Sequence, residues 1–175
     1  MFTSLYLPIF SVEGVIMTEL FERLVSLLKE KKLTISVAES CTGGLVAKHF
    51  TDIAGVSEVF YGGVVSYDNK VKMGILGVEE SVLSTQGAVS STTAMQMAKG
   101  VAKACYTDIG ISTTGIAGPG GGTKEKPVGT VYIGAFIDGN VHSTRLQINP
   151  SFSRDEIRHE ATRLLIEFVL SLLTA

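Results

Sequence analysis

The stretch that decides the fold is Val37-Ala38-Glu39-Ser40-Cys41-Thr42-Gly43-Gly44, an apolar segment that ends abruptly in a serine and two glycines. Residues 33–38 predict a buried strand, and residues 42–51 predict a helix directly after it. Ser40 therefore lies where a strand passes into a helix, and the backbone amides at a helix start are free to bind an anion. Two interpretations follow: a nucleophilic serine beside an oxyanion hole, or a plain helix cap at Ser40 or Thr42.

A candidate base for this serine is Lys72, which lies 32 residues further along the chain. A serine hydroxyl is a good nucleophile only when a base takes its proton, and lysine can act as that base only in its neutral form. The neighbours of Lys72 are apolar, which favours burial and a lowered pKa. Lys70 is expected to face solvent, and Tyr67 either relays a proton, holds the lysine or simply packs. The pattern suggests serine-lysine hydrolysis.

The rest of the chain alternates between helical and strand patterns, which predicts an α/β fold. The expected architecture is a three-layer α/β/α sandwich with a mixed β-sheet, formed by a single domain over residues 18–175. Residues 1–17 are expected to be an N-terminal extension outside this core. The predicted helices are 18–31 behind a Thr18 cap, 42–51, a short helix capped by Asp68, 90–104, and a last helix with a capping box at Ser153. The predicted strands are 33–38, 59–67, 108–114, and the hairpin 128–137 and 141–148 joined at Asp138-Gly139-Asn140.

Composition restricts the function classes. The chain has 175 residues, of which 45% are hydrophobic and 18% charged, and its net charge of -2 argues against general nucleic-acid binding. No run approaches the roughly 20 apolar residues that span a bilayer. The cysteines and the three histidines show no metal-ligand spacing, so we predict no metal and no cofactor. We expect reduced cysteines, a cytoplasmic location and a homodimer or higher homo-oligomer.

Two further features suggest anion binding. The glycine-rich segment 115–122 follows a strand but does not lead into a helix, so it is neither a P-loop nor a dinucleotide fingerprint. It is either a flexible connection or a place where backbone approaches a ligand. Arg154 lies in the first turn of the last helix, where the helix dipole disfavours a cation. Either Asp155 and Glu156 compensate its charge locally, or Arg154 binds an anion such as a phosphate.

Together, these segments resemble the C-terminal domain of the CinA competence-damage family, from about Leu20 to the C-terminus. The family includes nicotinamide mononucleotide deamidases. The resemblance therefore implies hydrolysis of the carboxamide of nicotinamide mononucleotide to nicotinic acid mononucleotide and ammonia, in pyridine nucleotide recycling. The segments that carry it are Ala38 to Gly44, Gly63 to Tyr67 with Asn69 and Lys72, Gly87 to Ser90, Thr114 to Gly122, and Glu125 to Thr130.

The resemblance also implies roles for individual residues. Ser40 is then the nucleophile, Lys72 the base and Tyr67 the third member of the catalytic group, while a mononucleotide is the partner. The competing hypothesis is a non-catalytic nucleotide-binding or regulatory domain that uses the same cleft. The expected substrate contacts are Thr42, Gly43, Gly44, Thr114, Gly115, Gly118, Gly120, Gly121 and Arg154.

Overall fold

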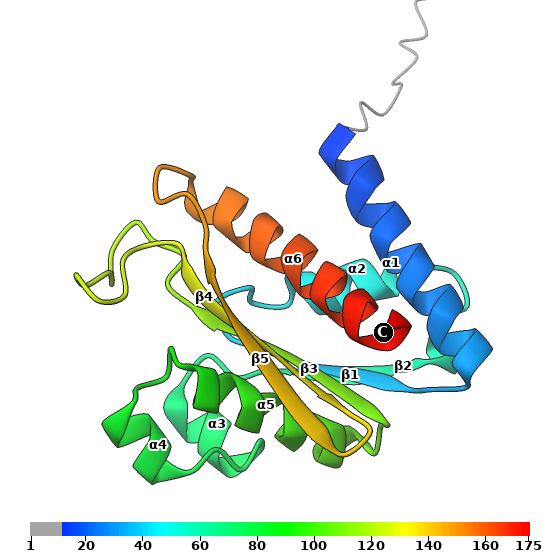
Figure 1. Cartoon of the computed structure of the whole chain (residues 1–175), viewed down its shortest axis with the longest axis horizontal. Coiled ribbons are helices and arrows are strands. Elements are labelled where there is room, and N and C mark those ends of the chain that lie inside the picture. The colour runs from blue at the N-terminus through cyan, green and yellow to red at the C-terminus, as the bar shows by residue number, and fades with distance from the viewer. Residues whose placement is uncertain (1–11) are drawn as a thin grey trace, which may run out of the picture.

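A mixed five-stranded sheet lies at the centre of the molecule (Figure 1). The computed structural model describes residues 12–175. The strand order is β2-β1-β3-β4-β5, in which β1 pairs parallel with both β2 and β3, and β4 pairs antiparallel with β3 and β5. The strands are β1 (Ile35–Glu39), β2 (Phe60–Val65), β3 (Ile109–Gly115), β4 (Thr130–Ile137) and β5 (Asn140–Gln147).

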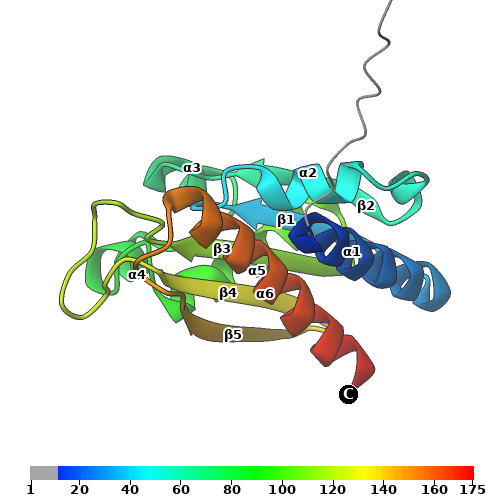
Figure 2. The ribbon, with the colours of Figure 1, turned by 90° about the horizontal axis from the view of Figure 1, so that it is seen from above.

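Helices cover both faces of this sheet, which confirms the predicted α/β sandwich with a mixed sheet (Figures 1 and 2). One face carries α1 (Val12–Lys31), α2 (Leu45–Thr51) and α6 (Arg154–Thr174). The other carries α3 (Asn69–Gly74), α4 (Glu80–Thr85) and α5 (Ser91–Cys105), and a 3-10 turn spans Val56–Glu58. None of the described helices is both long and apolar enough to cross a membrane.

The two faces bury separate apolar clusters. The larger cluster joins α1, α2 and α6 to the sheet, with Phe21, Phe50 and Leu165 fully buried in it. The smaller cluster joins α5 to the sheet and to the segment after α3, through residues such as Leu76 and Met97. Burial of apolar side chains is the main force that holds such layers together. The sheet is therefore packed on both faces, and the ends of its strands are left to carry a site.

Several local predictions are confirmed in detail. The Asp68 side chain accepts a hydrogen bond from the Lys70 amide at 2.8 Å and so caps α3. Ser153 and Glu156 form the predicted capping box at the start of α6. Asp138 and Gly139 both have positive φ angles, 50° and 78°, as expected for the tight turn of the β4–β5 hairpin.

Two predicted helix starts are wrong. Helix α1 begins at Val12 rather than behind Thr18, whose hydroxyl donates to the Gly14 carbonyl one turn back at 3.0 Å, and Met17 is buried in the core. The remaining part of the expected extension, residues 1–11, lies outside the described residues. Helix α2 begins at Leu45 rather than Thr42, because Gly43 and Gly44 have left-handed φ angles of 61° and 97° that no helix continues. The short helix α4 was not predicted, since six residues show no clear periodicity.

Gly100 in α5 is a close-contact position that links the fold to the candidate site. A Cβ atom at Gly100 would lie 1.9 Å from the carbonyl oxygen of Leu76, in the segment that follows α3. The backbone of α5 therefore packs directly against the segment that holds α3 in place. No other residue type fits there without moving one of the two segments.

We expect Gly100→Ala to lower the free energy of unfolding by about 1–3 kcal/mol, because the added methyl group overpacks this contact. Gly74→Ala is the matched control, since Gly74 is also helical but a Cβ atom added there would have no neighbour within 4 Å. Helix propensity alone predicts that both substitutions stabilise the protein. Urea unfolding of both variants distinguishes overpacking from helix propensity. A Gly100→Ala variant more stable than the wild type would contradict the packing argument.

Candidate active site

Ser40 and Lys72 meet at one edge of the sheet. Ser40 is the first residue after β1, and its amide donates to the Thr113 carbonyl of β3 at 3.0 Å. Lys72 lies on α3, which follows β2, the parallel neighbour of β1. The carboxyl ends of parallel strands lie at the same edge, where α/β proteins commonly bind ligands. Lys72 is only 1% exposed, and its Nζ atom lies 3.1 Å from the Ser40 Oγ atom.

The amine of Lys72 has only uncharged hydrogen-bond partners. Besides Ser40 Oγ, it contacts the backbone carbonyls of Ser66 at 2.5 Å and Tyr67 at 3.3 Å, and no carboxylate of residues 12–175 forms an ion pair with it. Burial lowers the pKa of Lys72, and the nearby Cys41 and Asp68 only partly oppose this shift. A neutral amine has two N–H groups and one lone pair. Two carbonyls and one hydroxyl match that set, as a general base for serine requires.

Lys70 does not contribute to the lowered pKa of Lys72. It is exposed, and its charge is not among the causes that act on Lys72. The predicted solvent-facing position of Lys70 is confirmed. Desolvation therefore favours the neutral form of the Lys72 amine, with no help from a second cation.

Cys41, the neighbour of Ser40, is a poor competitor as nucleophile. Burial raises the pKa of the Cys41 thiol to about 12, so the thiol stays protonated at neutral pH. Cys41 lies in the turn after β1, and both Cys41 and Cys105 are free. Of these two neighbouring side chains, Ser40 is the one that is hydrogen-bonded to the Lys72 amine.

A cavity of about 270 Å³ opens above Ser40 and Lys72. Its walls also come from the loop after β3, from the segment before α5, and from the start of α6. In the described chain, no group of three or more His, Cys, Asp or Glu side chains is placed to hold a metal ion. The predicted site residues that line the cavity are Ser40, Tyr67, Lys72, Thr114, Gly115, Gly118, Gly120, Gly121 and Arg154.

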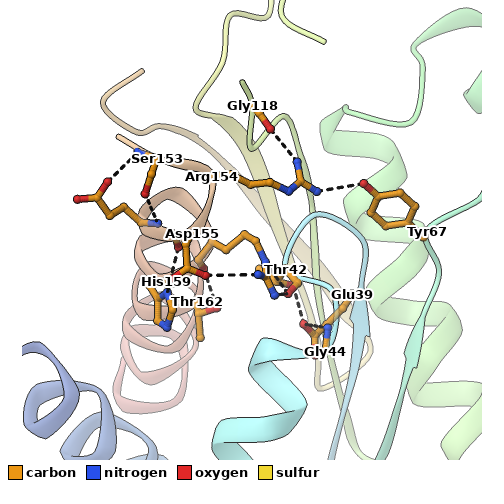
Figure 3. Close-up of polar contacts among 12 residues, drawn as sticks. Glu39, Thr42, Gly44, Tyr67, Gly118, Ser153, Arg154, Asp155, His159 and Thr162 are labelled. Carbon is orange, nitrogen blue, oxygen red and sulfur yellow. Dashed lines mark hydrogen bonds and ion pairs between the residues drawn. The ribbon is translucent and has the colours of Figure 1, made fainter. Parts of the chain in front are cut away.

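Arg154 reaches from α6 into this cavity. Its Nη1 atom donates to the Gly118 carbonyl at 2.8 Å and its Nη2 atom to the Tyr67 hydroxyl at 3.1 Å (Figure 3). No carboxylate of the described residues pairs with Arg154. Asp155 instead contacts Arg158, and Glu156 completes the capping box. Both acids lie in the first turn of α6, where they offset the helix dipole, but neither forms an ion pair with Arg154, so its guanidinium remains able to bind an anion.

The phenol of Tyr67 lines the cavity but is hydrogen-bonded to Arg154 rather than to Lys72. That side chain is 65% exposed and accepts the hydrogen bond from Arg154, whereas Lys72 is held by the backbone carbonyl of Tyr67. The hydroxyl of Thr114 is also engaged within the protein, because it donates a hydrogen bond to the Ala88 carbonyl at 2.7 Å. Ala88 lines the cavity, so Thr114 fixes a wall of the site.

Gly43 and Gly44 are not part of the cavity. Thr42, Gly43 and Gly44 are absent from its lining, and the Thr42 hydroxyl and the Gly44 amide both donate to the carboxylate of Glu39, at 2.6 and 2.9 Å (Figure 3). The expected use of these three residues as substrate contacts is therefore not supported by their positions. The amide of Cys41, which does line the cavity, has no backbone partner among the described residues.

Sequence reasoning missed several residues that build the site. Ala88 and Val89 form one wall, and their position depends on Lys126, which donates to the Val89 carbonyl at 2.7 Å. Glu39 was also missed, although an acidic residue that ends an apolar strand is an unusual and visible signal. Arg158 had no signal at all, since its contact with Thr42 joins residues 116 positions apart.

Comparisons with known proteins show to which family the chain belongs. The family model of the CinA C-terminal domain matches residues 17–173. The chain belongs to the CinA C-terminal domain family. A CinA-like protein of Kosmotoga olearia is 49% identical over 158 residues, which cover 90% of this chain and 38% of that relative. A CinA-like protein of Dictyoglomus turgidum is 53% identical over 141 residues, 81% of this chain and 34% of the relative.

A solved CinA-family structure also matches most of the chain. The competence/damage inducible protein CihA from Agrobacterium tumefaciens superposes with a TM-score of 0.87 at 40% identity, covering 91% of this chain and 96% of that one. The α/β fold is therefore that of the CinA family. In contrast, the chain spans less than two fifths of the length of the two CinA-like relatives.

The buried amine makes stability depend on pH. Because the pKa of Lys72 is lowered in the folded protein, the unfolded chain binds more protons between the two pKa values. The free energy of unfolding should therefore rise with pH over this window, and fall as the pH drops through the folded value. We expect Lys72→Met to lose this part of the pH dependence. Urea unfolding between about pH 7 and pH 10 measures it.

Lys70→Met is the control for this measurement. Lys70 is exposed and only two residues away, so its removal should leave the slope of stability against pH unchanged. An equal slope in wild type and Lys72→Met would show that the Lys72 amine is charged in the folded protein.

Proposed function

We propose that this chain is an amidase that hydrolyses the carboxamide of nicotinamide mononucleotide, giving nicotinic acid mononucleotide and ammonia. The observation that carries the proposal is the buried Lys72 amine, 3.1 Å from the Ser40 hydroxyl and without a carboxylate partner among the described residues. Membership of the CinA family supports the choice of substrate class. The serine and lysine supply nucleophile and base without a metal.

The first half of the reaction forms an acyl-enzyme. The lone pair of neutral Lys72 takes the proton of Ser40 as the serine oxygen attacks the carboxamide carbon. The tetrahedral intermediate carries a negative charge on the former carbonyl oxygen, and we assign its stabilisation to the backbone amide of Cys41, a residue that lines the cavity. The C–N bond then breaks, and ammonia leaves with the proton that Lys72 had accepted.

The second half releases the acid. Lys72, neutral again, takes a proton from a water molecule, and the resulting hydroxide attacks the ester carbon of the acyl-enzyme. The bond to Ser40 Oγ breaks, and the serine regains the proton from Lys72. The product is a carboxylic acid, which loses its proton to solvent to become the carboxylate, and the enzyme returns to its starting state.

The charges of the cavity favour an anionic substrate. Among the residues that line it, Arg154 carries a permanent positive charge, Lys72 is neutral in this scheme, and no carboxylate of the described chain lines the cavity. Lys72 lies beside the reacting serine, so Arg154 is the cation left for the phosphate group. A guanidinium binds phosphate oxygens with two parallel hydrogen bonds. A phosphate held there would place the amide end of the mononucleotide toward Ser40 and make attack effectively intramolecular.

We expect ammonia release from nicotinamide mononucleotide by the wild type, and a rate lowered by about 10⁴-fold or more in Ser40→Ala and Lys72→Met. Lys70→Met should retain wild-type activity, because Lys70 is exposed. A chelator should have no effect. Undiminished activity in Ser40→Ala would end the covalent mechanism, and loss of activity with the chelator would indicate a metal. Saturable mononucleotide binding with no ammonia would favour the non-catalytic alternative.

The pH profile of kcat/KM reports the base. Since the neutral form of Lys72 is the active one, activity should rise with pH through a single ionisation below the ordinary lysine pKa of 10.5. A profile that stays flat from about pH 6 to pH 10 would count against Lys72.

Substitution of Arg154 should weaken substrate binding. We expect Arg154→Met to raise KM for nicotinamide mononucleotide by about 10- to 100-fold, since charge-assisted hydrogen bonds are lost. The effect should disappear with nicotinamide riboside, which lacks the phosphate. Arg163→Met is the matched control, because Arg163 is on the same helix but pairs with Glu160 and Glu167. An equal loss on both substrates would refute the assignment of Arg154 to the phosphate.

A further inference from the structure

Glu39 is a buried acid that the reaction scheme does not use. It is only 1% exposed, and no cation of residues 12–175 forms an ion pair with it. Such a group is rare in protein interiors unless hydrogen bonds replace its water. Here Oε2 accepts from the Thr42 hydroxyl at 2.6 Å, the Gly44 amide at 2.9 Å and the Val46 amide at 3.2 Å. Oε1 accepts from the Ala47 amide at 2.8 Å.

These four hydrogen bonds link the Glu39 carboxylate to the segment that follows Ser40. The carboxylate of residue 39 reaches forward to residue 47, so every residue between them, including the nucleophile, lies within one hydrogen-bonded loop. The amides of Val46 and Ala47 belong to the first turn of α2, where amides have no partner inside the helix. The protein's own carboxylate thus occupies the helix start that the sequence predicted to bind the substrate.

The turn formed by residues 41–44 is also held through the carbonyl of Thr42. Arg158 of α6 donates to the Thr42 carbonyl from Nε at 3.1 Å and from Nη2 at 2.7 Å. The Thr42 and Thr113 hydroxyls are 2.7 Å apart, which ties the turn to β3. Residues 41–44 are therefore fixed to β1, β3, α2 and α6 at once, although two of them have left-handed backbone angles.

We propose that Glu39 is a positioning residue: its carboxylate fixes the turn 41–44 against α2 and thereby holds the Ser40 hydroxyl in reach of Lys72. This inference rests on the proposed function, in which Ser40 is the nucleophile. Glu39 contacts neither the cavity nor Lys72, so it acts only through the backbone that carries Ser40. Displacement of a reacting group by about 1 Å can cost a factor of about 100 in rate.

The test is Glu39→Gln, which keeps the shape but turns one oxygen into an NH₂ group that cannot accept from the backbone amides. We expect kcat for ammonia release to fall about 100-fold, with KM changed by less than about threefold, since Arg154 and Gly118 lie on other segments. The ionisation in the pH profile should stay where it is in the wild type, because Lys72 remains buried. Wild-type kcat in a folded but less stable Glu39→Gln would show that the carboxylate only stabilises the fold, and would overturn the proposal.

A second pair of variants covers the case in which Glu39→Gln fails to fold. Thr42→Val keeps the volume of a fully buried side chain and removes its hydrogen bonds to Glu39 and Thr113, whereas Thr42→Ser keeps both bonds. We expect kcat to fall about tenfold in Thr42→Val and to be largely restored in Thr42→Ser, with KM unchanged in both. Equal kcat in the two variants would contradict the proposal.

A fluorophosphonate probe separates this inference from the choice of substrate. The probe reports the reactivity of Ser40 directly, so its rate constant should fall in Glu39→Gln in parallel with kcat. If the wild type is labelled at Ser40 but releases no ammonia, the amidase proposal fails and the labelling rates alone decide on Glu39. A wild type that neither reacts with the probe nor releases ammonia overturns both, because no reactive serine exists to be positioned.

Discussion

The burial of one lysine amine is the constraint on which the arrangement of this site depends. Removing an amine from water is costly unless it finds hydrogen-bond partners and loses its charge. The segment from Ser66 to Lys72 meets this demand, because the two residues that follow β2 present their carbonyls to the amine that the last turn of α3 carries. The third partner is the Ser40 hydroxyl from the neighbouring strand. The close approach of α5 at Gly100 keeps the segment after α3, and with it the lysine, in place.

The two buried ionisable groups Glu39, at the end of β1, and Lys72, on α3, form no salt bridge with each other. Lys72 is surrounded by oxygen acceptors, and Glu39 by hydroxyl and amide donors. A direct pair would hold the lysine in its charged form and remove the base. Because each group is satisfied separately, the lysine can be neutral while the carboxylate holds the turn. The amides at the start of α2 are then already bonded to Glu39, which is why the proposed anion contact is Arg154.

Helix α6 contacts both the cavity and the turn that follows Ser40. Its first residue, Arg154, reaches the glycine-rich loop and Tyr67, and Arg158, one turn later, reaches the turn beside the nucleophile. The capping box at Ser153 and Glu156 fixes where this helix begins, and its apolar face packs on the sheet. In this member of the CinA family, one rigid element therefore sets the distance between the proposed phosphate contact and the serine.

The sequence alone determined the alternation of strands and helices, the caps at Asp68 and Ser153, the β4–β5 hairpin, and the candidates Ser40 and Lys72. These depend on spacing and on near neighbours, which a sequence displays directly. The tertiary structure decided the start of α2, the four bonds of Glu39, and the bond from Arg154 to Tyr67, which are 87 residues apart. Arg154 and Tyr67 lie on segments that only packing brings together, whereas the Glu39 bonds are local but depend on the left-handed turn at Gly43 and Gly44. Periodicity says which face of an element is buried, but not which polar group on another element will meet it.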